Sequence, residues 1–464
     1  MNKINKPKAQ LPKGFRDSTE ENIDIRNQVI AIIRNECEKF GFKNIETPAL
    51  EYTEALGKFL PDVDRPSGGV FSFQDEDDQW ISMRYDLTAP LARYVAENYQ
   101  FIPKPFKRYQ VGSVWRNEKP GPGRYREFIQ FDADAIGISN NYVDAELCVM
   151  VAKIFLELGF TAKEYKVKYS SRVIWEDLFK KINLDEIQIP AVLRAVDKLD
   201  RLGIDGVKEL LLEGRQDKSG DFMQGVNLKD SQANEILEFI SNKTIKDDQL
   251  NSFEEYLQNY KELPFEFDPT VVRGLEYYTG LVFEVELTAK ILNDKGKEVI
   301  FGSVAGGGRY DKLIARFGKE DVPATGISIG VDRLVYAIEQ FDKISANKKP
   351  LIIIANLISD EISTYLNIAD QLRLEGYACE IFYGSNNLSK QLKYCDKRGA
   401  SAVVIIGEDE LKNNKISIKN LTVGKEMSKN IDSREEWKEL KAGQFTINKD
   451  CLLYTSPSPR DNSG

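Results

Sequence analysis

VGSVWRNEKPGPGRYREFIQFDADAI, residues 111–136, is the stretch of this chain that decides its fold. Strand-forming residues stand on both sides of KPGPG, residues 119–123, a run that favours a turn and disfavours helix and strand. The pattern predicts a long antiparallel hairpin over residues 106–136. Because side chains alternate between the faces of a strand, Arg116 and Glu118 share one face of the first strand. The matching face of the returning strand holds Arg124, Arg126, Phe128, Gln130, Asp132 and Asp134.

This face combines arginines, an aromatic ring and hydrogen-bond acceptors. Arginine offers a planar fork of donors that suits phosphate oxygens. Phe128 could stack on a nucleobase, and Gln130 and Asp134 could bind a small polar or cationic ligand. The alternative is a solvated sheet face with cross-strand ion pairs. That alternative explains the turn, but it does not explain why so many strand positions carry polar residues that seldom form strands.

A second candidate segment is VVRGLEYYTGLVFEVEL, residues 271–287. Arg273 precedes one glycine, and the pair Tyr277 and Tyr278 precedes Gly280. Glycine allows the backbone to bend or to approach a ligand closely. The two tyrosines reach one pocket only if the strand is distorted, so a bulged strand with an arginine stacked on tyrosine is the alternative.

Two more glycine-rich segments follow. In SVAGGGRYDKLI, residues 303–314, the glycines 306–308 could cradle a substrate backbone, although a tight turn between a strand and a helix is the alternative. In ATGISIGVDRL, residues 324–334, a glycine-spaced strand leads into a helix with Arg333 near its start. The alternative there is close packing of strand and helix with a surface arginine.

The last candidate segment is SMRYDLTAPLARYVA, residues 82–96. Asp86 and Thr88 have the spacing that places both on one face at the end of a strand. The alternative role for both is to cap a helix that begins near Ala89.

The composition limits the chemistry that these segments can perform. The chain has 464 residues, 42% of them hydrophobic and 30% charged, and contains no histidine, which excludes a Ser-His-Asp triad and any histidine-ligated metal. The net charge of −9 argues against an overall basic coat, but a local basic groove remains possible. The five cysteines form no CxxC pair, which is typical of reduced thiols in the cytoplasm. No apolar run is long enough for a membrane span, and no signal peptide is expected.

Periodicity divides the chain into domains of mixed α and β structure. The predicted core contains short strands, antiparallel hairpins and helices, and the segment 170–263 is charged, helical and free of the motifs above. Residues 351–450 alternate strands and helices in the manner of a small, largely parallel α/β domain. The string CLLYTSPSPRD that begins at Cys451 resembles translated sequencing adapter, with a Ser/Pro-rich disordered tail as the alternative. The expected parts are a core of residues 1–169 and 264–342, an insertion of 170–263, a domain of 351–450 and a foreign tail of 451–464.

In combination and order, these segments resemble the histidyl-tRNA synthetase family of class II aminoacyl-tRNA synthetases. The hairpin resembles motif 2, residues 324–334 resemble motif 3, and FGFKNIETPALEYTEAL (40–56) resembles the dimer-forming motif 1. RGLEYY and GGRYD resemble the histidine signatures, and residues 391–411 resemble part of an anticodon-binding domain. The resemblance covers about residues 11–450 and implies the fold class: an α+β core with an antiparallel sheet flanked by helices, a helical insertion and a C-terminal α/β anticodon-binding domain.

The resemblance also implies a role for each candidate residue. The residues that it assigns to histidine are Asp86, Thr88, Arg116, Gln130, Asp134, Arg273, Tyr277 and Tyr278, with Asp134 and Tyr278 at the imidazole. The residues that it assigns to ATP are Arg116, Glu118, Arg124, Phe128 and Arg333, with Phe128 on the adenine. Arg116 and Arg273 are expected to act at the α-phosphate. ATP with Mg²⁺, L-histidine, the histidine tRNA and a homodimer are the implied cofactors and partners, and the Mg²⁺ ligands are unknown.

Three positions depart from the family pattern. Glu276 replaces the usual aspartate of RGLDYY, RYDLT replaces the RPEGT of many bacterial members, and Gly121 replaces the glutamine of PQxGR in the motif 2 loop. That glutamine is implicated in reading the extra 5′ guanosine of the histidine tRNA. Two rival functions remain open: a non-catalytic regulatory subunit of histidine biosynthesis, which typically lacks the anticodon domain, and a protein that only binds its ligands.

Overall fold

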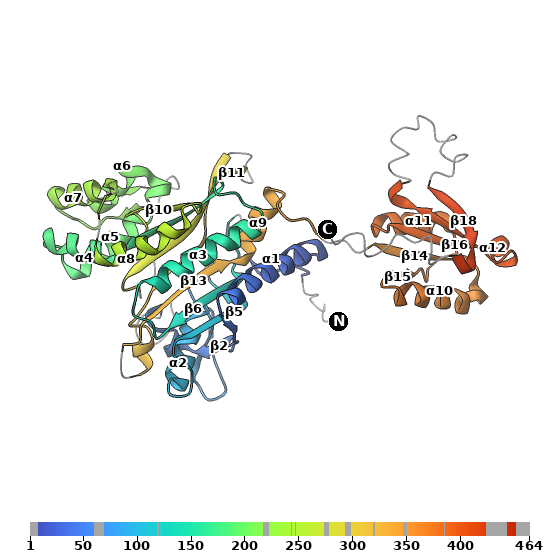
Figure 1. Ribbon diagram of the computed structural model, residues 1–464, viewed down its shortest axis with the longest axis horizontal. Coiled ribbons are helices and arrows are strands. Elements are labelled where there is room, and N and C mark those ends of the chain that lie inside the picture. The colour runs from blue at the N-terminus through green and yellow to red at the C-terminus, as the bar shows by residue number, and fades with distance from the viewer. Residues whose placement is uncertain are drawn as a thin grey trace, which may run out of the picture. The chain divides into compact units, whose positions relative to one another are not determined.

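In the computed structural model, the chain forms two compact units, Met1–Ala346 and Asn347–Gly464 (Figure 1). Each unit is described by itself. The residues that the structure describes are 8–59, 69–117, 120–121, 123–216, 222–242, 244–245, 247–272, 278–292, 298–318, 321–346, 350–384, 386–423 and 443–451.

An eight-stranded sheet forms the centre of the first unit, with strand order β1-β5-β6-β13-β12-β11-β7-β10. Its strands are β1 (Lys43–Asn44), β5 (Phe106–Trp115), β6 (Glu127–Ile136), β7 (Tyr165–Ser171), β10 (Phe265–Phe267), β11 (Leu281–Leu292), β12 (Glu298–Arg309) and β13 (Ala324–Gly330). All pairs are antiparallel except β1 with β5 and β7 with β10 at the two edges. The prediction of a mixed α and β fold around an antiparallel sheet is confirmed.

Three helices pack together against this sheet: α1 (Glu20–Lys39), α3 (Tyr142–Glu157) and α9 (Val331–Gln340). Helix α1 shows why the sequence predicts a helix here, because four apolar residues that recur every four positions lie on one side of it and are buried. They are Ile25, Val29, Ile33 and Cys37. Gly41 follows with a φ of +81°, a left-handed conformation that favours glycine and ends the helix.

The first unit also contains a smaller sheet, below the main sheet in Figure 1. Its strands run in the order β2-β4-β3 beside helix α2 and two short 3₁₀ helices. The bounds are β2 (Leu50–Tyr52), β3 (Ser72–Gln74), β4 (Trp80–Met83), α2 (Thr88–Asn98), η1 (Thr53–Phe59) and η4 (Ile314–Phe317).

The segment 170–263 forms the helical part at the left of Figure 1. Its helices are α4 (Arg172–Lys181), α5 (Ile189–Val196), α6 (Leu199–Leu211), α7 (Asp230–Ser241) and α8 (Asp248–Leu257), with two short 3₁₀ helices η2 (Glu186–Gln188) and η3 (Gln258–Tyr260). It also contains a hairpin, β8 (Gly214–Gln216) with β9 (Phe222–Gln224), that the sequence analysis does not anticipate. Trp175 and Phe253 belong to the same buried cluster as the residues of α3 and β7, so these helices share the core of the main sheet.

In the second unit, the strand order is β15-β14-β16-β17-β18. Helices α10 (Ile362–Leu374) and α11 (Leu388–Lys397) cover opposite faces, since Ile352 and Ile354 pack in one cluster while Ile353 packs in the other. The strands are β14 (Leu351–Asn356), β15 (Ala378–Ile381), β16 (Ala402–Ile406), β17 (Lys415–Asn420) and β18 (Gln444–Asn448), with a short helix α12 (Glu408–Lys412) and the 3₁₀ helices η5 (Ser359–Glu361) and η6 (Lys449–Cys451). The first three strands are parallel as predicted, whereas β17 and β18 are antiparallel.

One local prediction is wrong. Glycines 306–308 do not form a turn between a strand and a helix. They belong to β12, directly before its last residue, Arg309, and pair with β11 on one side and β13 on the other. The reason is tertiary. A Cβ at Gly307 would lie 2.0 Å from the Gly326 carbonyl oxygen, and one at Gly308 would lie 3.0 Å from the Tyr278 ring. Glycine is needed here for close packing within the sheet.

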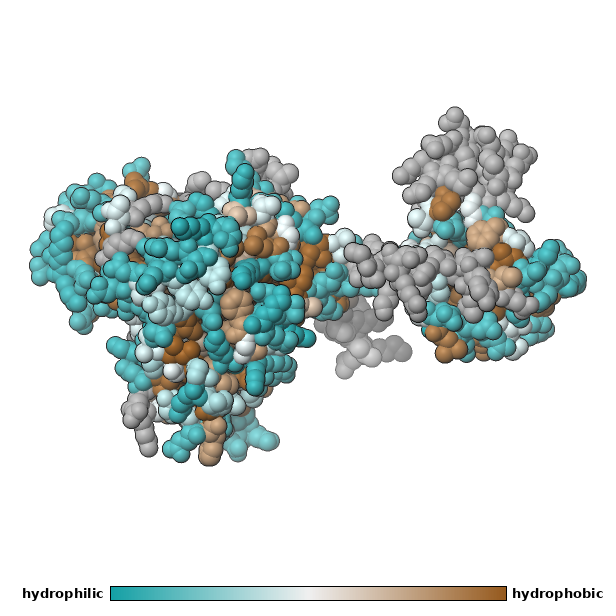
Figure 2. Space-filling model, viewed as in Figure 1, coloured by the Kyte–Doolittle hydropathy of each residue, from teal (hydrophilic) through white to brown (hydrophobic). Residues whose placement is uncertain are grey.

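Hydrophilic residues cover most of the face that Figure 2 shows, with hydrophobic residues in scattered areas. Among the described residues, no helix has the length and apolar character that a membrane crossing requires.

Candidate active site

A cavity of about 1060 Å³ opens over the central strands of the main sheet. Eight of the predicted site residues line it: Thr88, Arg116, Arg124, Phe128, Gln130, Asp134, Tyr278 and Arg333. Asp86 lies directly behind Thr88, to whose backbone it is bonded. The other three predicted residues, Glu118, Arg273 and Tyr277, lie outside the described residues.

Strand β6 sets the distances within the cavity. Phe128, Gln130 and Asp134 are on one face, as predicted, and the strand pairs them with Val114, Gly112 and Arg108 of β5. Six residues of extended chain span about 20 Å. The cavity therefore separates an aromatic end at Phe128 from an acidic end at Asp134 by roughly the length of an amino acid joined to a nucleotide.

Arg116 lies at the aromatic end, one residue beyond β5. Its guanidinium carbon is 4.4 Å from the centre of the Tyr85 ring and 5.2 Å from that of Phe128. Its Nε donates to the Tyr85 carbonyl oxygen at 3.2 Å. Two rings and a carbonyl group thus fix the orientation of this cation in the cavity.

The hairpin tip and motif 3 supply two further arginines. Arg124 is exposed, and its main chain forms an antiparallel bridge with Gly121. Arg333 is bound more tightly: its Nε donates to the Ser303 oxygen at 2.6 Å and its Nη2 to the Phe301 oxygen at 2.5 Å. Burial, together with the nearby charge of Arg124, lowers the pKa of Arg333 to about 10. At neutral pH both side chains therefore add positive charge to this side of the cavity.

Asp134, at the acidic end, is held by two neighbours. It accepts a short hydrogen bond from the Tyr310 hydroxyl on Oδ1, and Oδ2 lies 2.8 Å from Nη2 of Arg108. Burial raises the pKa of Asp134, while Arg108 and the Tyr310 hydroxyl oppose that shift. These two partners hold the carboxylate in place. It lies close against the β13 backbone, since a Cβ at Gly326 would collide with it.

Asp86 combines the two roles that the sequence leaves open. Its Oδ1 accepts from the backbone N–H groups of Thr88 at 3.1 Å and Ala89 at 2.9 Å, and so caps the first two N–H groups of α2 from the position before the N-cap residue, Leu87. Its Oδ2 is buried and has no hydrogen-bond partner among the described residues. Burial raises the pKa of this carboxyl group, and the Ala89 N–H and the Arg116 charge lower it in turn.

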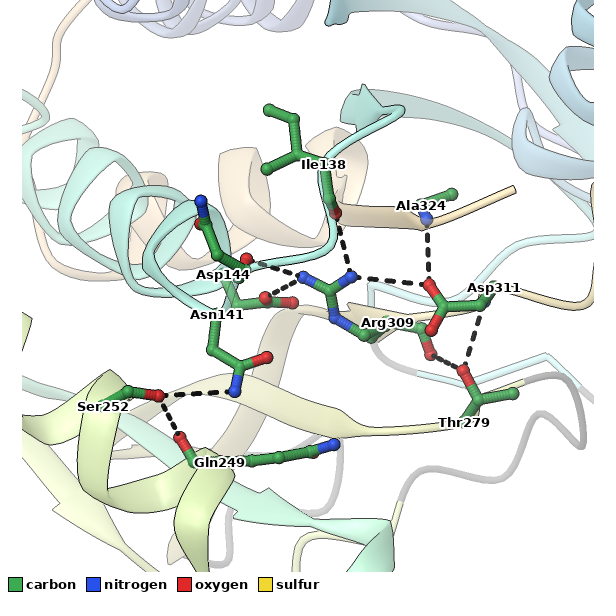
Figure 3. Close-up of polar contacts among 10 residues, drawn as sticks. Ile138, Asn141, Asp144, Gln249, Ser252, Thr279, Arg309, Asp311 and Ala324 are labelled. Carbon is green, nitrogen blue, oxygen red and sulfur yellow. Dashed lines mark hydrogen bonds and ion pairs between the residues drawn. The ribbon is translucent and has the colours of Figure 1, made fainter. Parts of the chain in front are cut away.

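A polar network around Arg309, shown in Figure 3, holds Thr279, the residue that follows Tyr278. Arg309 is 3% exposed and forms a short ion pair with Asp144 of α3. Its guanidinium also donates to the carbonyl oxygens of Ile138 and Asn140, each at 3.0 Å. The Arg309 carbonyl oxygen accepts from the Thr279 N–H at 2.8 Å, directly after Tyr278. The network therefore joins α3, the end of β12 and the start of β11.

Several residues around the cavity are not anticipated by the sequence analysis. Arg108 and Tyr310 hold Asp134, and Ser328 of β13 accepts a hydrogen bond of 2.7 Å from Gln130 Nε2. Arg108 has a signal in the sequence, because strand alternation and the hairpin register place it opposite Asp134. Val196, Asp197 and Leu199 line the cavity from the helical segment without a recognisable sequence signal.

The antiparallel sheet, its arginine-bearing hairpin and the strand leading into α9 are the catalytic architecture of class II aminoacyl-tRNA synthetases. A family model described as histidyl-tRNA synthetase matches residues 14–334, and one described as an anticodon binding domain matches residues 351–442. A histidine–tRNA ligase of Bartonella quintana is 43% identical over 97% of this chain and 96% of its own length, and one of Brucella ovis is 42% identical over 97% and 96%. The chain belongs to the histidyl-tRNA synthetase family.

Solved structures agree on the fold. The histidyl-tRNA synthetase of Nostoc sp. PCC 7120 superposes with a TM-score of 0.69 at 24% identity, covering 97% of this chain and 99% of its own. The apo enzyme of S. aureus gives a TM-score of 0.64 at 22% identity, covering 96% and 98%.

Proposed function

We propose that this chain is a histidine–tRNA ligase, which activates L-histidine with ATP and transfers it to the 3′ end of its tRNA. The observation that best supports this proposal is that one cavity extends from an acidic end at Asp134 to an arginine-rich, aromatic end at Phe128. Such a site suits a cationic amino acid beside a nucleoside triphosphate, because each part meets groups of opposite charge or an aromatic face.

The residues of the chain act in this reaction by position and charge. Asp134 and Tyr278 bind the imidazole, and Asp86, Thr88 and Gln130 bind the α-amino group. The histidine carboxylate is already a nucleophile, so it needs no general base when it attacks the α-phosphorus and pyrophosphate leaves. Arg116 and Arg273 stabilise the charge on the phosphorus oxygens, while Arg124 and Arg333 hold the departing pyrophosphate. A chain without histidine can perform every one of these steps.

Mg²⁺ is proposed to arrive with ATP. Among the described residues, no group of three carboxylate or thiol ligands is placed to hold a metal. Mg²⁺ commonly keeps several waters and uses one or two carboxylates together with substrate phosphates. Glu284, which lines the cavity near Arg333, is the carboxylate that fits this arrangement. The ion would supply further positive charge to the phosphates.

The regulatory subunit of histidine biosynthesis is the alternative. The residues matched by the anticodon binding domain model, 351–442, favour the ligase, because such subunits typically lack that domain. The cationic set in the cavity also favours catalysis, since Arg116 and Arg333 are both present and face the same space. As in other members of the family, we propose a cytoplasmic homodimer formed through residues 40–56.

Pyrophosphate exchange tests the proposal. The purified chain should incorporate labelled pyrophosphate into ATP when histidine is present, and none of the other nineteen amino acids should replace it. Arg273→Ala should lose most of this exchange while the protein stays folded, because positive charge at the α-phosphate is lost. A pure wild-type protein that shows no histidine-dependent exchange would contradict the ligase and favour a regulatory or binding role.

The residue at the tip of the hairpin predicts whether the enzyme requires the extra 5′ guanosine of its tRNA. Gly121 stands where many relatives have glutamine, and its N–H and carbonyl groups are bonded to Arg124 at 3.0 and 2.8 Å. With no side chain at this position, Gly121 cannot read the extra 5′ guanosine of the histidine tRNA. Transcripts with and without that guanosine should therefore be charged at similar kcat/KM. A loss of more than about tenfold without it would refute the prediction, and Gly121→Gln serves as the comparison variant.

A further inference from the structure

Asp132 is a buried carboxylate that the residue roles described above do not use. It lies on β6 between Gln130 and Asp134, two residues that line the cavity, and on the same face of the strand. Its side chain is 1% exposed, and its Oδ1 has no hydrogen-bond partner among the described residues. A buried carboxylate oxygen without a hydrogen-bond partner is costly, and a cation bound beside it would lower that cost.

Two other buried acceptors in the same place are also without a partner among the described residues: Asp86 Oδ2 and Gln130 Oε1. Thr88 connects Asp86 with Asp132, because its backbone N–H donates to Asp86 Oδ1 and its hydroxyl donates to Asp132 Oδ2 at 3.4 Å. Ser328 connects Gln130 to the same group through β13, where it pairs with Asp132. The three unpaired acceptors, on Asp86, Gln130 and Asp132, equal in number the three N–H donors of an ammonium group.

We propose that Asp132 is the buried counter-charge for the α-ammonium group of the amino acid substrate, and that it acts together with Asp86, Thr88 and Gln130. The inference rests on the proposed function and adds to it a specificity-determining residue. An analogue of the substrate that lacks the α-amino group would leave all three acceptors unpaired, and for that reason it would bind poorly.

The surrounding charges explain why Asp132 responds to the substrate. Asp86 faces it from the segment before α2 and Asp134 from its own strand, while the positive charges are Arg84 beside β4 and Arg108 on β5. Ser328 of β13 contributes a hydroxyl group. Burial and the charge of Asp134 raise the pKa of Asp132 to about 7, against the opposing effects of Arg108 and Ser328.

An arriving ammonium group favours the ionised carboxylate and lowers that pKa. Because its pKa is raised, this carboxyl group in the free protein binds a proton at a higher pH than an ordinary aspartate does, and a bound proton leaves to solvent when the substrate binds. The ammonium group keeps its own three protons. Affinity for histidine should therefore fall as the pH drops below about 7, in addition to any effect of the imidazole.

Asp132→Asn tests the proposal, because it keeps the shape and removes the charge. We expect its KM for histidine in pyrophosphate exchange to rise roughly 10- to 100-fold, as for loss of a charge-assisted contact. The KM for ATP should stay within about twofold, and the melting temperature should not fall, since repulsion among the carboxylates is relieved. Asp132→Glu, which restores the charge, should recover part of the loss.

The decisive comparison uses imidazolepropionate, which is histidine without its α-amino group, as a competitive inhibitor. The wild-type protein should discriminate between the two ligands far more strongly than Asp132→Asn does. Calorimetry at pH 6.5 in two buffers should show more proton release on histidine binding to the wild-type protein than to Asp132→Asn, whereas the analogue should show no such difference between the two proteins. Because each ligand is compared with itself, its imidazole proton cancels.

Equal weakening of both ligands in Asp132→Asn would overturn the proposal and assign Asp132 a structural role. An unchanged KM for histidine in Asp132→Asn would overturn it as well. Either result can be obtained while the wild-type protein shows histidine-dependent pyrophosphate exchange. Each is therefore distinguishable from a failure of the proposed ligase function.

Discussion

Replacement of Arg116 by alanine is expected to lower kcat for histidine-dependent pyrophosphate exchange by roughly 1000-fold. Removal of one preorganised donor from a charged transition state commonly costs 100- to 1000-fold, and loss of an arginine at a transferring phosphoryl group costs more. Arg116 is held between the rings of Tyr85 and Phe128, so its charge is already oriented before ATP binds. Steady-state exchange assays at saturating ATP and histidine measure the effect.

Two variants control this result. Arg116→Lys keeps the charge without the planar fork and should recover only part of the activity. Lys107→Ala removes a positive charge from β5, the strand that leads to Arg116, but Lys107 is paired with Glu146 of α3 on the opposite face. Its activity should stay within about threefold of wild type. If Arg116→Ala loses less than tenfold, the role at the α-phosphate is wrong.

The largest effect on stability is expected from Arg309→Met. This change leaves the Asp144 carboxylate, which is 0% exposed, without its cationic partner. Breaking a buried ion pair from one side typically costs about 3–5 kcal/mol, because the remaining charge stays buried and uncompensated. Urea unfolding followed by tryptophan fluorescence measures the change, since three of the four tryptophans lie in the first unit.

A double variant separates charge from packing. Arg309→Met with Asp144→Asn removes both charges and should recover much of the lost stability. The pH dependence has a defined sign. Burial already raises the pKa of Asp144, and loss of the arginine raises it further, so the folded variant binds a proton more readily than the unfolded chain. The stability deficit of Arg309→Met should therefore shrink as the pH is lowered from 8 towards 5. A deficit below about 1 kcal/mol at pH 8 would contradict the role of this pair.

Periodicity predicts most elements of this fold correctly. The apolar spacing in α1, the alternation along β6 and the alternating strands and helices after residue 350 are local signals that tertiary contacts reinforce. The glycines 306–308 show the limit, since a glycine run is compatible with a turn or with tight strand packing. Only the neighbouring strands β11 and β13 select between them, through contacts that no local pattern encodes.

The sequence alone determined which residue types are available for the chemistry. Without histidine, the site must depend on carboxylates, arginines and tyrosine, and the even spacing of Phe128, Gln130 and Asp134 is enough to place them on one face of a strand. The resemblance to a known family implied their roles. Both kinds of information follow from order and spacing along the chain.

The tertiary structure decided how those residues are held. Asp86 both caps α2 and keeps one oxygen unpaired, Asp134 is fixed between Arg108 and Tyr310, and Asp132 lies in a cluster of carboxylates. Each of these facts depends on burial and on partners distant in sequence. Burial and charge set the pKa and the orientation of a side chain, and both arise only when the strands are assembled into the sheet.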